Sequence, residues 1–209
     1  MLIEIIDKYY QNKRSEKVQT HFYITDCGKC PRAVYFSMKG YPKKELEARV
    51  LRVFEHGDST HERIMRVLYS LGLVVAREVE IPNEEVIHGR CDGIISIKGK
   101  EYIIEIKTIR DFKFAKLVEP ETAHRRQINL YMHYFRKPQG IVLYESKDTQ
   151  NLKEFIVEYD LKLCKEILQR FEELKYQIEN DILPQKPLDL ESWQCDYCDY
   201  KEECDKILT

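Results

Sequence analysis

The sequence predicts a mixed α/β fold in a single domain, and two observations lead to this prediction. Stretches in which apolar residues recur at helical spacing alternate with β-branched and aromatic runs, in the order helices, strands, helix, strands, helix. A length of 209 residues suits one domain with a full hydrophobic core. We therefore expect a central sheet flanked by helices, with the two ends of the chain pinned together.

The first half of the chain is expected to supply helices and then an antiparallel set of strands. Apolar residues at helical spacing predict helical structure over 45–71, which Gly57, Asp58 and Ser59 are expected to interrupt before capping a second helix. Runs rich in β-branched residues follow and predict strands over 74–81, 86–97 and 102–108.

The second half is expected to alternate between helix and strand. A helix is predicted over 121–135, and it is expected to end before Pro138. Two apolar runs predict strands over 140–144 and 155–159. A continuous apolar stripe then predicts a helix over 161–178.

A hairpin in the middle of the chain carries the first candidate site. If Gly99 and Lys100 form a two-residue loop, Asp92 lies opposite Lys107 and Ile94 lies opposite Glu105. Since side chains alternate along a strand, Asp92, Glu105 and Lys107 then share one face. Two carboxylates and an ammonium group on one patch suit a metal-dependent phosphodiesterase, and the alternative is a solvated, salt-bridged strand face.

Three further side chains are candidates for the same site. His61, on the helix that precedes the carboxylate strands, is a possible ligand of a divalent metal. Gln127 and Tyr131 are four residues apart and share a helical face, so Gln127 could orient a water or Lys107, and Tyr131 could stack on a base or hold a phosphate. The alternatives are a surface histidine and polar residues at the margin of a half-buried helix.

Five of the seven cysteines fall into two groups with metal-binding spacing. Pairs separated by two residues can bind one metal ion, because the intervening turn brings both sulfurs to one side. Zinc would use Cys27, Cys30, Cys195 and Cys198, whereas an iron-sulfur cluster would use Cys195, Cys198 and Cys204 with one N-terminal cysteine. Cys91 and Cys164 lie in apolar contexts and are expected to be buried thiols.

Charge and hydropathy limit the possible partners. The 34 Lys and Arg residues nearly balance 36 Asp and Glu residues, so a contact with DNA has to come from local basic clusters rather than from the net charge of -2. No stretch approaches the roughly 18 apolar residues of a membrane span, and the N-terminus lacks the pattern of a signal peptide. We expect an intracellular, cytoplasmic protein with no membrane partner.

Six short motifs occur in a fixed order along nearly the whole chain. They are YITDCGKCPRAVYF at 23–36, GDSTHE at 57–62, GRCDGI at 89–94, EIK at 105–107, QINLY at 127–131 and CDYCDYKEEC at 195–204. Together they resemble the RecB-like nucleases of the PD-(D/E)XK superfamily, most closely the CRISPR-associated Cas-four-type iron-sulfur exonucleases and their viral homologues. The resemblance implies a restriction-endonuclease-like core, with a mixed central sheet between helices.

The resemblance also implies a role for each candidate residue. Mg2+ or Mn2+ would be held by His61, Asp92, Glu105 and the main-chain carbonyl of Ile106, with Lys107 and Gln127 completing the catalytic set. A 4Fe-4S cluster would be held by Cys30, Cys195, Cys198 and Cys204, in a lobe formed by 20–44 and 184–209 of a single nuclease domain. Cys27 is then an extra cysteine, which leaves the N-terminal ligand and a structural zinc ion open. Substrate contacts are expected from Tyr131, Arg32, Arg125 and Arg126.

The implied activity is cleavage of DNA, most simply single-stranded DNA, as an exonuclease or an endonuclease. The implied setting is CRISPR spacer acquisition or viral or cellular DNA processing, with CRISPR integration proteins or a separate helicase as possible partners. The alternative is a metal-stapled protein that binds nucleic acid through an inactive nuclease site.

Overall fold

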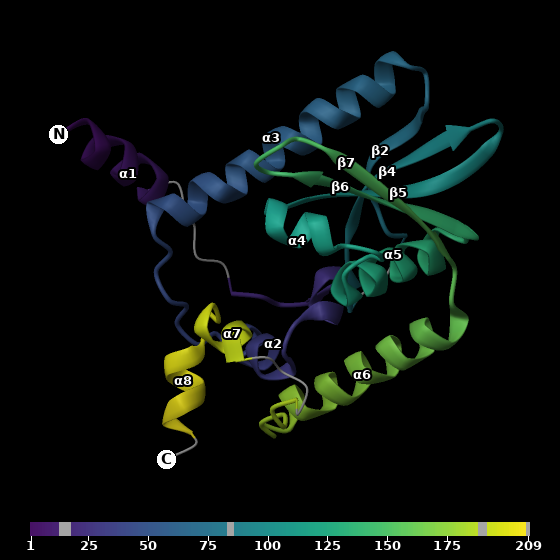
Figure 1. Cartoon of the computed structure of the whole chain (residues 1–209). Helices are drawn as coiled ribbons and strands as arrows, with labels where there is room; N and C mark the ends of the chain where they lie inside the picture. The colour runs from purple at the N-terminus through teal and green to yellow at the C-terminus, as the bar shows by residue number, and fades with distance from the viewer. Residues whose placement is uncertain (13–17, 83–85, 188–191, 208–209) are drawn as a thin grey trace. The chain divides into compact units, whose positions relative to one another are not determined.

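The computed structural model describes residues 1–12, 18–82, 86–187 and 192–207 (Figure 1). The contacts within the chain divide it into two compact units. The sheet unit comprises Tyr23–Gly28 and His56–Leu168. The terminal unit comprises Met1–Phe22, Lys29–Glu55 and Gln169–Thr209. The terminal unit thus draws on both ends of the chain, while the strands of the large sheet all belong to the sheet unit. The predicted cluster-binding lobe includes 188–191 and 208–209, which lie outside the described residues.

A five-stranded sheet forms the centre of the sheet unit. Its strand order is β2-β4-β5-β6-β7, with β5 and β6 parallel and the other neighbours antiparallel. The predicted mixed α/β architecture is therefore confirmed, as is the antiparallel pairing of its first three strands. The bounds are Val74–Glu80 for β2, Arg90–Ile97 for β4, Lys100–Ile109 for β5, Gln139–Ser146 for β6 and Leu152–Glu158 for β7. Two short strands, β1 (Phe22–Tyr23) and β3 (Ile87–His88), form a separate pair.

The predicted register of the β4–β5 hairpin is wrong, because the loop lies one residue earlier in the chain than predicted. Each residue of β4 therefore pairs two positions away from its predicted partner in β5. The loop consists of Lys98 and Gly99, whose φ angles of 50° and 79° both lie in the left-handed region required at the two central positions of a type I′ turn. Beyond the last recorded pair, Gly93 with Ile104, this register brings Asp92 opposite Glu105 rather than Lys107. Because side chains alternate with a period of two, a change of two residues in the pairing leaves every side chain on its predicted face.

Helix α3 (Ala48–Ser70) covers one face of the sheet and runs through Gly57 without a break, so the predicted interruption is wrong. A glycine inside a helix costs only about 1 kcal/mol relative to alanine. That cost is outweighed because Ile64 and Met65, further along the helix, are buried in a cluster with four isoleucines of the sheet, Ile95, Ile104, Ile106 and Ile141.

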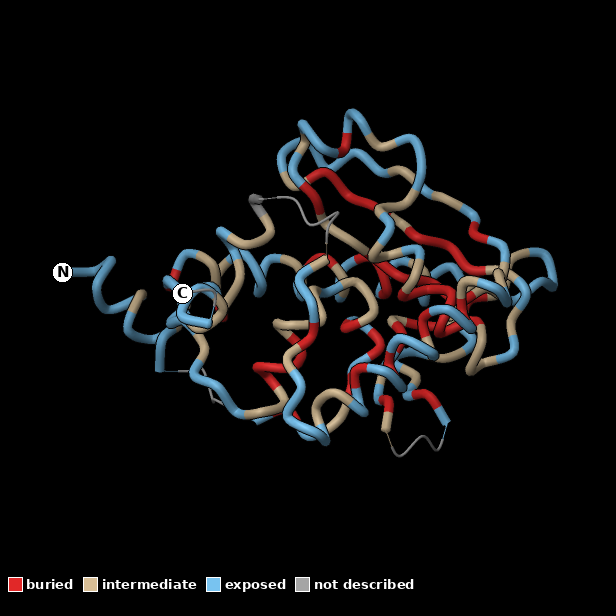
Figure 2. Tube along the Cα trace, turned by 90° about the horizontal axis from the view of Figure 1, so that it is seen from below, coloured by how far each residue is buried: buried red, intermediate tan, exposed pale blue. Residues whose placement is uncertain are grey.

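Helix α5 (Thr122–Phe135) covers the opposite face, and close approaches of small residues fix its position. A β-carbon at Gly140 of β6 would lie 2.7 Å from Cδ1 of Ile128 on α5. The 3-10 helix η1 (Ile24–Gly28) is equally close, since a β-carbon at Gly28 would lie 2.5 Å from that of Ala123. The sheet and α5 contain many of the buried residues. Figure 2 shows the buried stretches of the chain in red.

Two further helices belong wholly or partly to the sheet unit. Helix α4 (Asp111–Lys116) follows β5 directly, and α6 begins after β7 and spans Leu161–Glu179. The first turn of α6 contacts α5, because the Cys164 thiol donates a hydrogen bond to the carbonyl oxygen of Asn129 at 3.3 Å. Cys91 and Cys164 are both buried thiols, as predicted.

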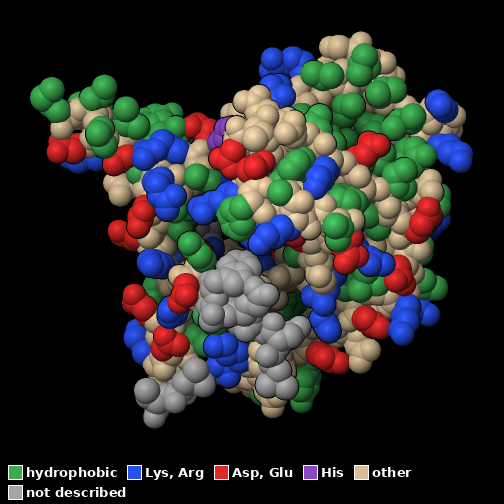
Figure 3. Space-filling view, viewed as in Figure 1, with side chains coloured by type: hydrophobic (Ala, Val, Ile, Leu, Met, Phe, Trp, Pro, Cys, Tyr) green, Lys and Arg blue, Asp and Glu red, His purple; other side chains and the backbone are tan. Residues whose placement is uncertain are grey.

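The terminal unit contains short helices and a conspicuously apolar N-terminal helix. Its complete helices are α1 (Leu2–Asn12), α2 (Pro31–Met38), α7 (Ser192–Asp196) and α8 (Lys201–Lys206). Helix α1 has no buried residue, and exposed apolar side chains gather over it (Figure 3). No helix within the described residues is long and apolar enough to span a membrane. On the face drawn in Figure 3, basic and acidic side chains are interspersed, as the near-zero net charge suggests.

Candidate functional site

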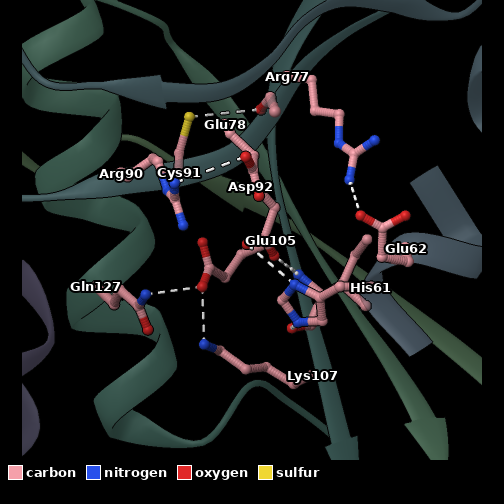
Figure 4. A network of polar contacts seen from close by, with 12 residues as sticks. His61, Glu62, Arg77, Glu78, Arg90, Cys91, Asp92, Glu105, Lys107 and Gln127 are labelled. Carbon is pink, nitrogen blue, oxygen red and sulfur yellow. Dashed lines mark hydrogen bonds and ion pairs between the residues drawn. The ribbon is translucent and has the colours of Figure 1, made fainter. Parts of the chain in front are cut away.

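A buried carboxylate on β5 is the centre of the candidate site (Figure 4). Glu105 is almost fully buried, and its Oε1 atom accepts hydrogen bonds from Nζ of Lys107 and Nε2 of Gln127, both at 2.7 Å. Among the described residues, the other carboxylate oxygen, Oε2, is buried and has no hydrogen-bond partner. Since buried polar atoms are nearly always paired, an unpaired carboxylate oxygen indicates a position where a cation can bind.

His61 joins α3 to the two central strands beside this carboxylate. Its Nε2 donates to the main-chain carbonyl of Ile106 at 2.6 Å, and its Nδ1 lies 3.2 Å from Oδ1 of Asp92. The other oxygen of Asp92 accepts a hydrogen bond from the main-chain N–H of Ile106 at 2.6 Å. The structure therefore places His61, Asp92 and the main chain of Ile106 in direct contact, and Glu105 lies on the same strand face as Asp92.

The charges of the site oppose one another. Burial raises the pKa of Glu105, the ammonium group of Lys107 acts against this rise, and the carboxylate of Asp92 adds to it. Burial lowers the pKa of His61, but the hydrogen bond and charge of Asp92, the Ile106 carbonyl and the charge of Glu105 together outweigh burial, so that the net change in pKa is upward. A site with two adjacent carboxylates, one of them desolvated, favours the binding of positive charge.

The residues fit a divalent metal in their chemistry, although they do not form a finished cage. Carboxylate and carbonyl oxygens with an imidazole suit Mg2+ or Mn2+. Within the described part of the chain, no group of three or more His, Cys, Asp or Glu side chains is arranged closely enough to hold a metal ion. The contacts of His61 with Ile106 and Asp92 use atoms that would face an ion, so an ion bound there would replace these contacts.

Three consecutive residues of α3 attach the helix to different strands of the sheet. His61 reaches Asp92 and Ile106 in the middle of the sheet, as described above. Glu62 forms an ion pair with Arg77 of β2 at 2.5 Å, and Arg63 pairs with the buried Glu145 of β6 at 2.5 Å. Arg63 and Glu145 were not among the predicted site residues, although a glutamate at the end of the apolar run in β6 indicates a buried charge that needs a partner.

Tyr131 differs from its predicted role in substrate binding. Its ring is buried, and its hydroxyl donates a hydrogen bond at 2.9 Å to the main-chain carbonyl of Arg90. A ring in this position has no free face on which a base could stack. Tyr131 instead connects α5 to the beginning of β4, two residues before Asp92.

His124, on the same helical face, is also part of the surroundings of the site. Its Nδ1 lies 2.7 Å from the hydroxyl of Tyr144. Burial lowers the pKa of His124 to about 3, and the positive charges of Lys107 and Lys113 lower it further. The imidazole is therefore neutral at physiological pH and adds no positive charge beside Lys107.

The cysteines separate into two environments. Cys27 belongs to the sheet unit, where burial raises its pKa to about 12 and Arg126 lies near enough to act against this. Cys30 belongs to the terminal unit with the three tail cysteines, and all four are half-buried. Burial raises the pKa of Cys198, and the neighbouring Cys30 adds to this rise.

The four thiols of the terminal unit suit a thiolate-ligated cluster in number, although as described they do not lie closely enough together to hold a metal ion. The main-chain N–H of Tyr200 donates to the sulfur of Cys198 at 3.4 Å. Arg32 donates to the sulfur of Cys204 at 3.5 Å through Nη1, and to the carbonyl of Pro184 at 2.8 Å through Nε. Hydrogen bonds to sulfur are typical around iron-sulfur clusters, where they stabilise the negative charge of the ligands.

The arginines predicted to bind backbone phosphates have different surroundings. The guanidinium of Arg32 is engaged with the cysteine-bearing segment, so it does not point freely toward substrate. Arg125 is exposed on α5, and Arg126 is half-buried near Cys27. Arg125 therefore remains the more accessible of the predicted phosphate contacts.

Comparison with known proteins identifies relatives along the whole chain. The model of the PD-(D/E)XK nuclease superfamily matches residues 5–205. The CRISPR-associated exonuclease Cas4 of Saccharolobus solfataricus is 27% identical over 224 residues, covering 98% of this chain and 100% of that protein. A crystal structure of SSO0001 is 26% identical with a TM-score of 0.64, covering 100% of this chain and 98% of the other.

A more distant structure shares the fold alone. The alkaline exonuclease LHK-Exo from Laribacter hongkongensis is 14% identical with a TM-score of 0.57, over 96% of this chain and 99% of its own. The fold around Glu105 is therefore found in proteins of very different sequence.

Proposed function

Because the chain belongs to the PD-(D/E)XK nuclease superfamily, we propose that it is an Mg2+- or Mn2+-dependent deoxyribonuclease that cleaves single-stranded DNA. The observation that supports this most directly is the unpaired, buried Oε2 atom of Glu105, on the same face as Asp92 and Lys107. Relatives whose names describe exonucleases support DNA as the substrate.

The chain's own residues have distinct tasks in this proposal. His61, Asp92, Glu105 and the carbonyl of Ile106 would hold the metal ion. The ion would neutralise charge on the phosphate oxygens and make a water molecule more acidic. Lys107, held by Glu105, would orient the attacking water or stabilise negative charge on the phosphate. Gln127 keeps Glu105 in place from the other side.

We further propose that Cys30, Cys195, Cys198 and Cys204 hold a 4Fe-4S cluster that stabilises the terminal unit. Metal binding to ligands so distant in sequence contributes directly to folding. The alternative is a structural zinc ion, for which the sequence predicts Cys27, Cys30, Cys195 and Cys198 as ligands. Purified protein with visible charge-transfer absorbance and bound iron would support the cluster, whereas a colourless protein with stoichiometric zinc would exclude it.

CRISPR spacer acquisition is the biological setting we favour, because the relative from Saccharolobus solfataricus carries a CRISPR-associated name. Viral or cellular DNA processing is the alternative setting. The partners we propose are CRISPR integration proteins or a separate helicase. A protein that binds DNA through an inactive site is the second candidate function, and it predicts retained binding without cleavage in every metal tested.

The test compares wild type with Asp92→Asn and Lys107→Ala on end-labelled linear and circular single strands in Mg2+ and in Mn2+. Asparagine keeps an oxygen that can accept the hydrogen bond from Ile106, so the fold should be preserved. Each variant should lose activity by at least about 100-fold, the usual effect of removing one group that stabilises a transition state. Lys100→Ala, at the exposed end of the hairpin, is the matched control and should cleave normally.

Unchanged cleavage by Asp92→Asn or Lys107→Ala would exclude these residues from the chemistry. Cleavage of the linear strand alone would identify an exonuclease, and cleavage of both substrates an endonuclease.

A further inference from the structure

Arg90 is a basic side chain beside the candidate site that none of the roles above uses. It is the first residue of β4, and because it precedes Asp92 by two positions the two side chains lie on the same face of the strand. Figure 4 shows Arg90 on the same side of the site as Gln127 of α5. Its side chain is 59% exposed, and its Nη1 lies 3.6 Å from Oε2 of Glu78. The guanidinium is therefore accessible to a ligand that approaches the site.

The backbone of Arg90 is fixed although its side chain is exposed. The buried hydroxyl of Tyr131 donates to the Arg90 carbonyl at 2.9 Å. Tyr131 stands one helical turn after Gln127, which holds Glu105. One face of α5 thus fixes both the carboxylate at the centre of the site and the point from which Arg90 projects.

Glu78 has an unusual backbone conformation for a residue within a strand. Its φ of 49° lies in the left-handed region, which residues other than glycine rarely adopt. It stands between the pairs Arg77–Gly93 and Val79–Cys91, which places it opposite Asp92. Strained backbone of this kind is concentrated at functional sites. The strain here accompanies a carboxylate that faces Arg90 and is itself 52% exposed.

From these contacts we infer that Arg90 binds a backbone phosphate of the DNA strand next to the phosphate that is cleaved, and that Glu78 pairs with Arg90 until DNA replaces it. The inference rests on the proposed function. A guanidinium can bind a phosphate through two parallel hydrogen bonds, whereas an ion pair between two half-exposed side chains contributes little. Replacement of the Glu78 carboxylate by a DNA phosphate as the partner of Arg90 is therefore favourable. Tyr131 acts as a positioning residue that holds the Arg90 backbone.

The test measures the binding of a fluorescein-labelled oligothymidylate by fluorescence anisotropy, in EDTA so that the metal-dependent reaction cannot proceed. Arg90→Gln should weaken binding about 5- to 10-fold, the loss of one charge-assisted phosphate contact. It should also reduce the slope of log K against log salt by about 0.7, the value for one phosphate contact on a single strand, between about 50 and 200 mM salt. Arg90→Lys should keep the slope but weaken binding about threefold, because the fork of the guanidinium is lost.

Glu78→Gln tests the competition, because it should change affinity in the opposite direction. Without the carboxylate, Arg90 is available to the phosphate and binding should tighten about twofold. Lys100→Gln is the matched control, since it removes one positive charge at the far end of the same hairpin, where Lys100 pairs with Ile97. Its affinity and its salt slope should equal those of wild type.

Equal affinities of Arg90→Gln and wild type would overturn the inference. Equal losses of affinity in Arg90→Gln and Lys100→Gln would also overturn it, because they would indicate a general effect of charge. Weaker binding by Glu78→Gln would overturn the competition with DNA. Cleavage by wild type is measured in parallel with Mn2+. If wild type does not cleave DNA but the variants show the predicted differences in binding, the proposed function is contradicted. The phosphate contact of Arg90 is then still supported.

Discussion

The ion pair between Arg63 of α3 and Glu145 of β6 leads to a prediction about which partner matters more for stability. The two side chains differ greatly in burial, since Glu145 is 3% exposed and Arg63 is 53% exposed. Arg63→Gln leaves a carboxylate in the protein interior without a charged partner, which costs about 3 kcal/mol. Glu145→Gln leaves a guanidinium that water can solvate, so the loss should be about 1 kcal/mol.

Thermal and urea unfolding of both variants measure this difference. For a chain of this size, 1 kcal/mol corresponds to about 2–4 °C in Tm, so Arg63→Gln should lower Tm by about 6–12 °C and Glu145→Gln by about 2–4 °C. The double variant Arg63→Gln/Glu145→Gln should recover most of the larger loss, because it contains no buried unpaired charge. Equal losses in the two single variants, or a larger loss in Glu145→Gln, would refute the reasoning from burial.

Three further predictions concern the buried acid, the glycines and the cysteines. Burial raises the pKa of Glu105 from 4.5 to about 7, so its contribution to stability is present below about pH 4.5 and is lost as the pH rises through 7. In calorimetry without metal, Glu105→Gln should therefore have a Tm several degrees above that of wild type at about pH 8 but not at about pH 4. The same variant should lose cleavage. Identical dependence of Tm on pH in the two proteins would contradict this. Gly28→Ala places a β-carbon 2.5 Å from one on α5 and should cost about 1–3 kcal/mol in urea unfolding, whereas Gly57→Ala has room within its helix and should add up to about 1 kcal/mol. Cys30→Ser should lose the bound iron and Cys27→Ser should retain it by iron analysis, and the reverse result would assign Cys27 as the ligand.

The sequence was sufficient for the strand faces and the order of the elements. Alternation along a strand depends only on backbone geometry, so the common face of Asp92, Glu105 and Lys107 was predictable even though the hairpin register was not. Lys98 has to adopt a positive φ to form the observed loop, and nothing in a lysine side chain signals this. Turn propensity therefore favoured Gly99 and Lys100 as the loop residues, whereas the loop consists of Lys98 and Gly99.

Interactions between distant segments account for the remaining differences. The continuity of α3 through Gly57 depends on the burial of Ile64 and Met65 against strands that follow later in the chain. Helical spacing placed Tyr131 on the same face as Gln127, but it could not show that the hydroxyl ends at the carbonyl of Arg90. The pair of Arg63 and Glu145 joins residues 82 positions apart, and no local pattern connects them.

The three successive contacts of His61, Glu62 and Arg63 with different strands determine which lengths of α3 are compatible with a working site. One inserted residue upstream turns the following helix by about 100° and moves it by about 1.5 Å, so all three contacts would be lost together. A single substitution removes one contact at a time. Relatives of this chain should therefore tolerate substitutions at exposed positions of α3 more readily than an insertion within the helix before His61.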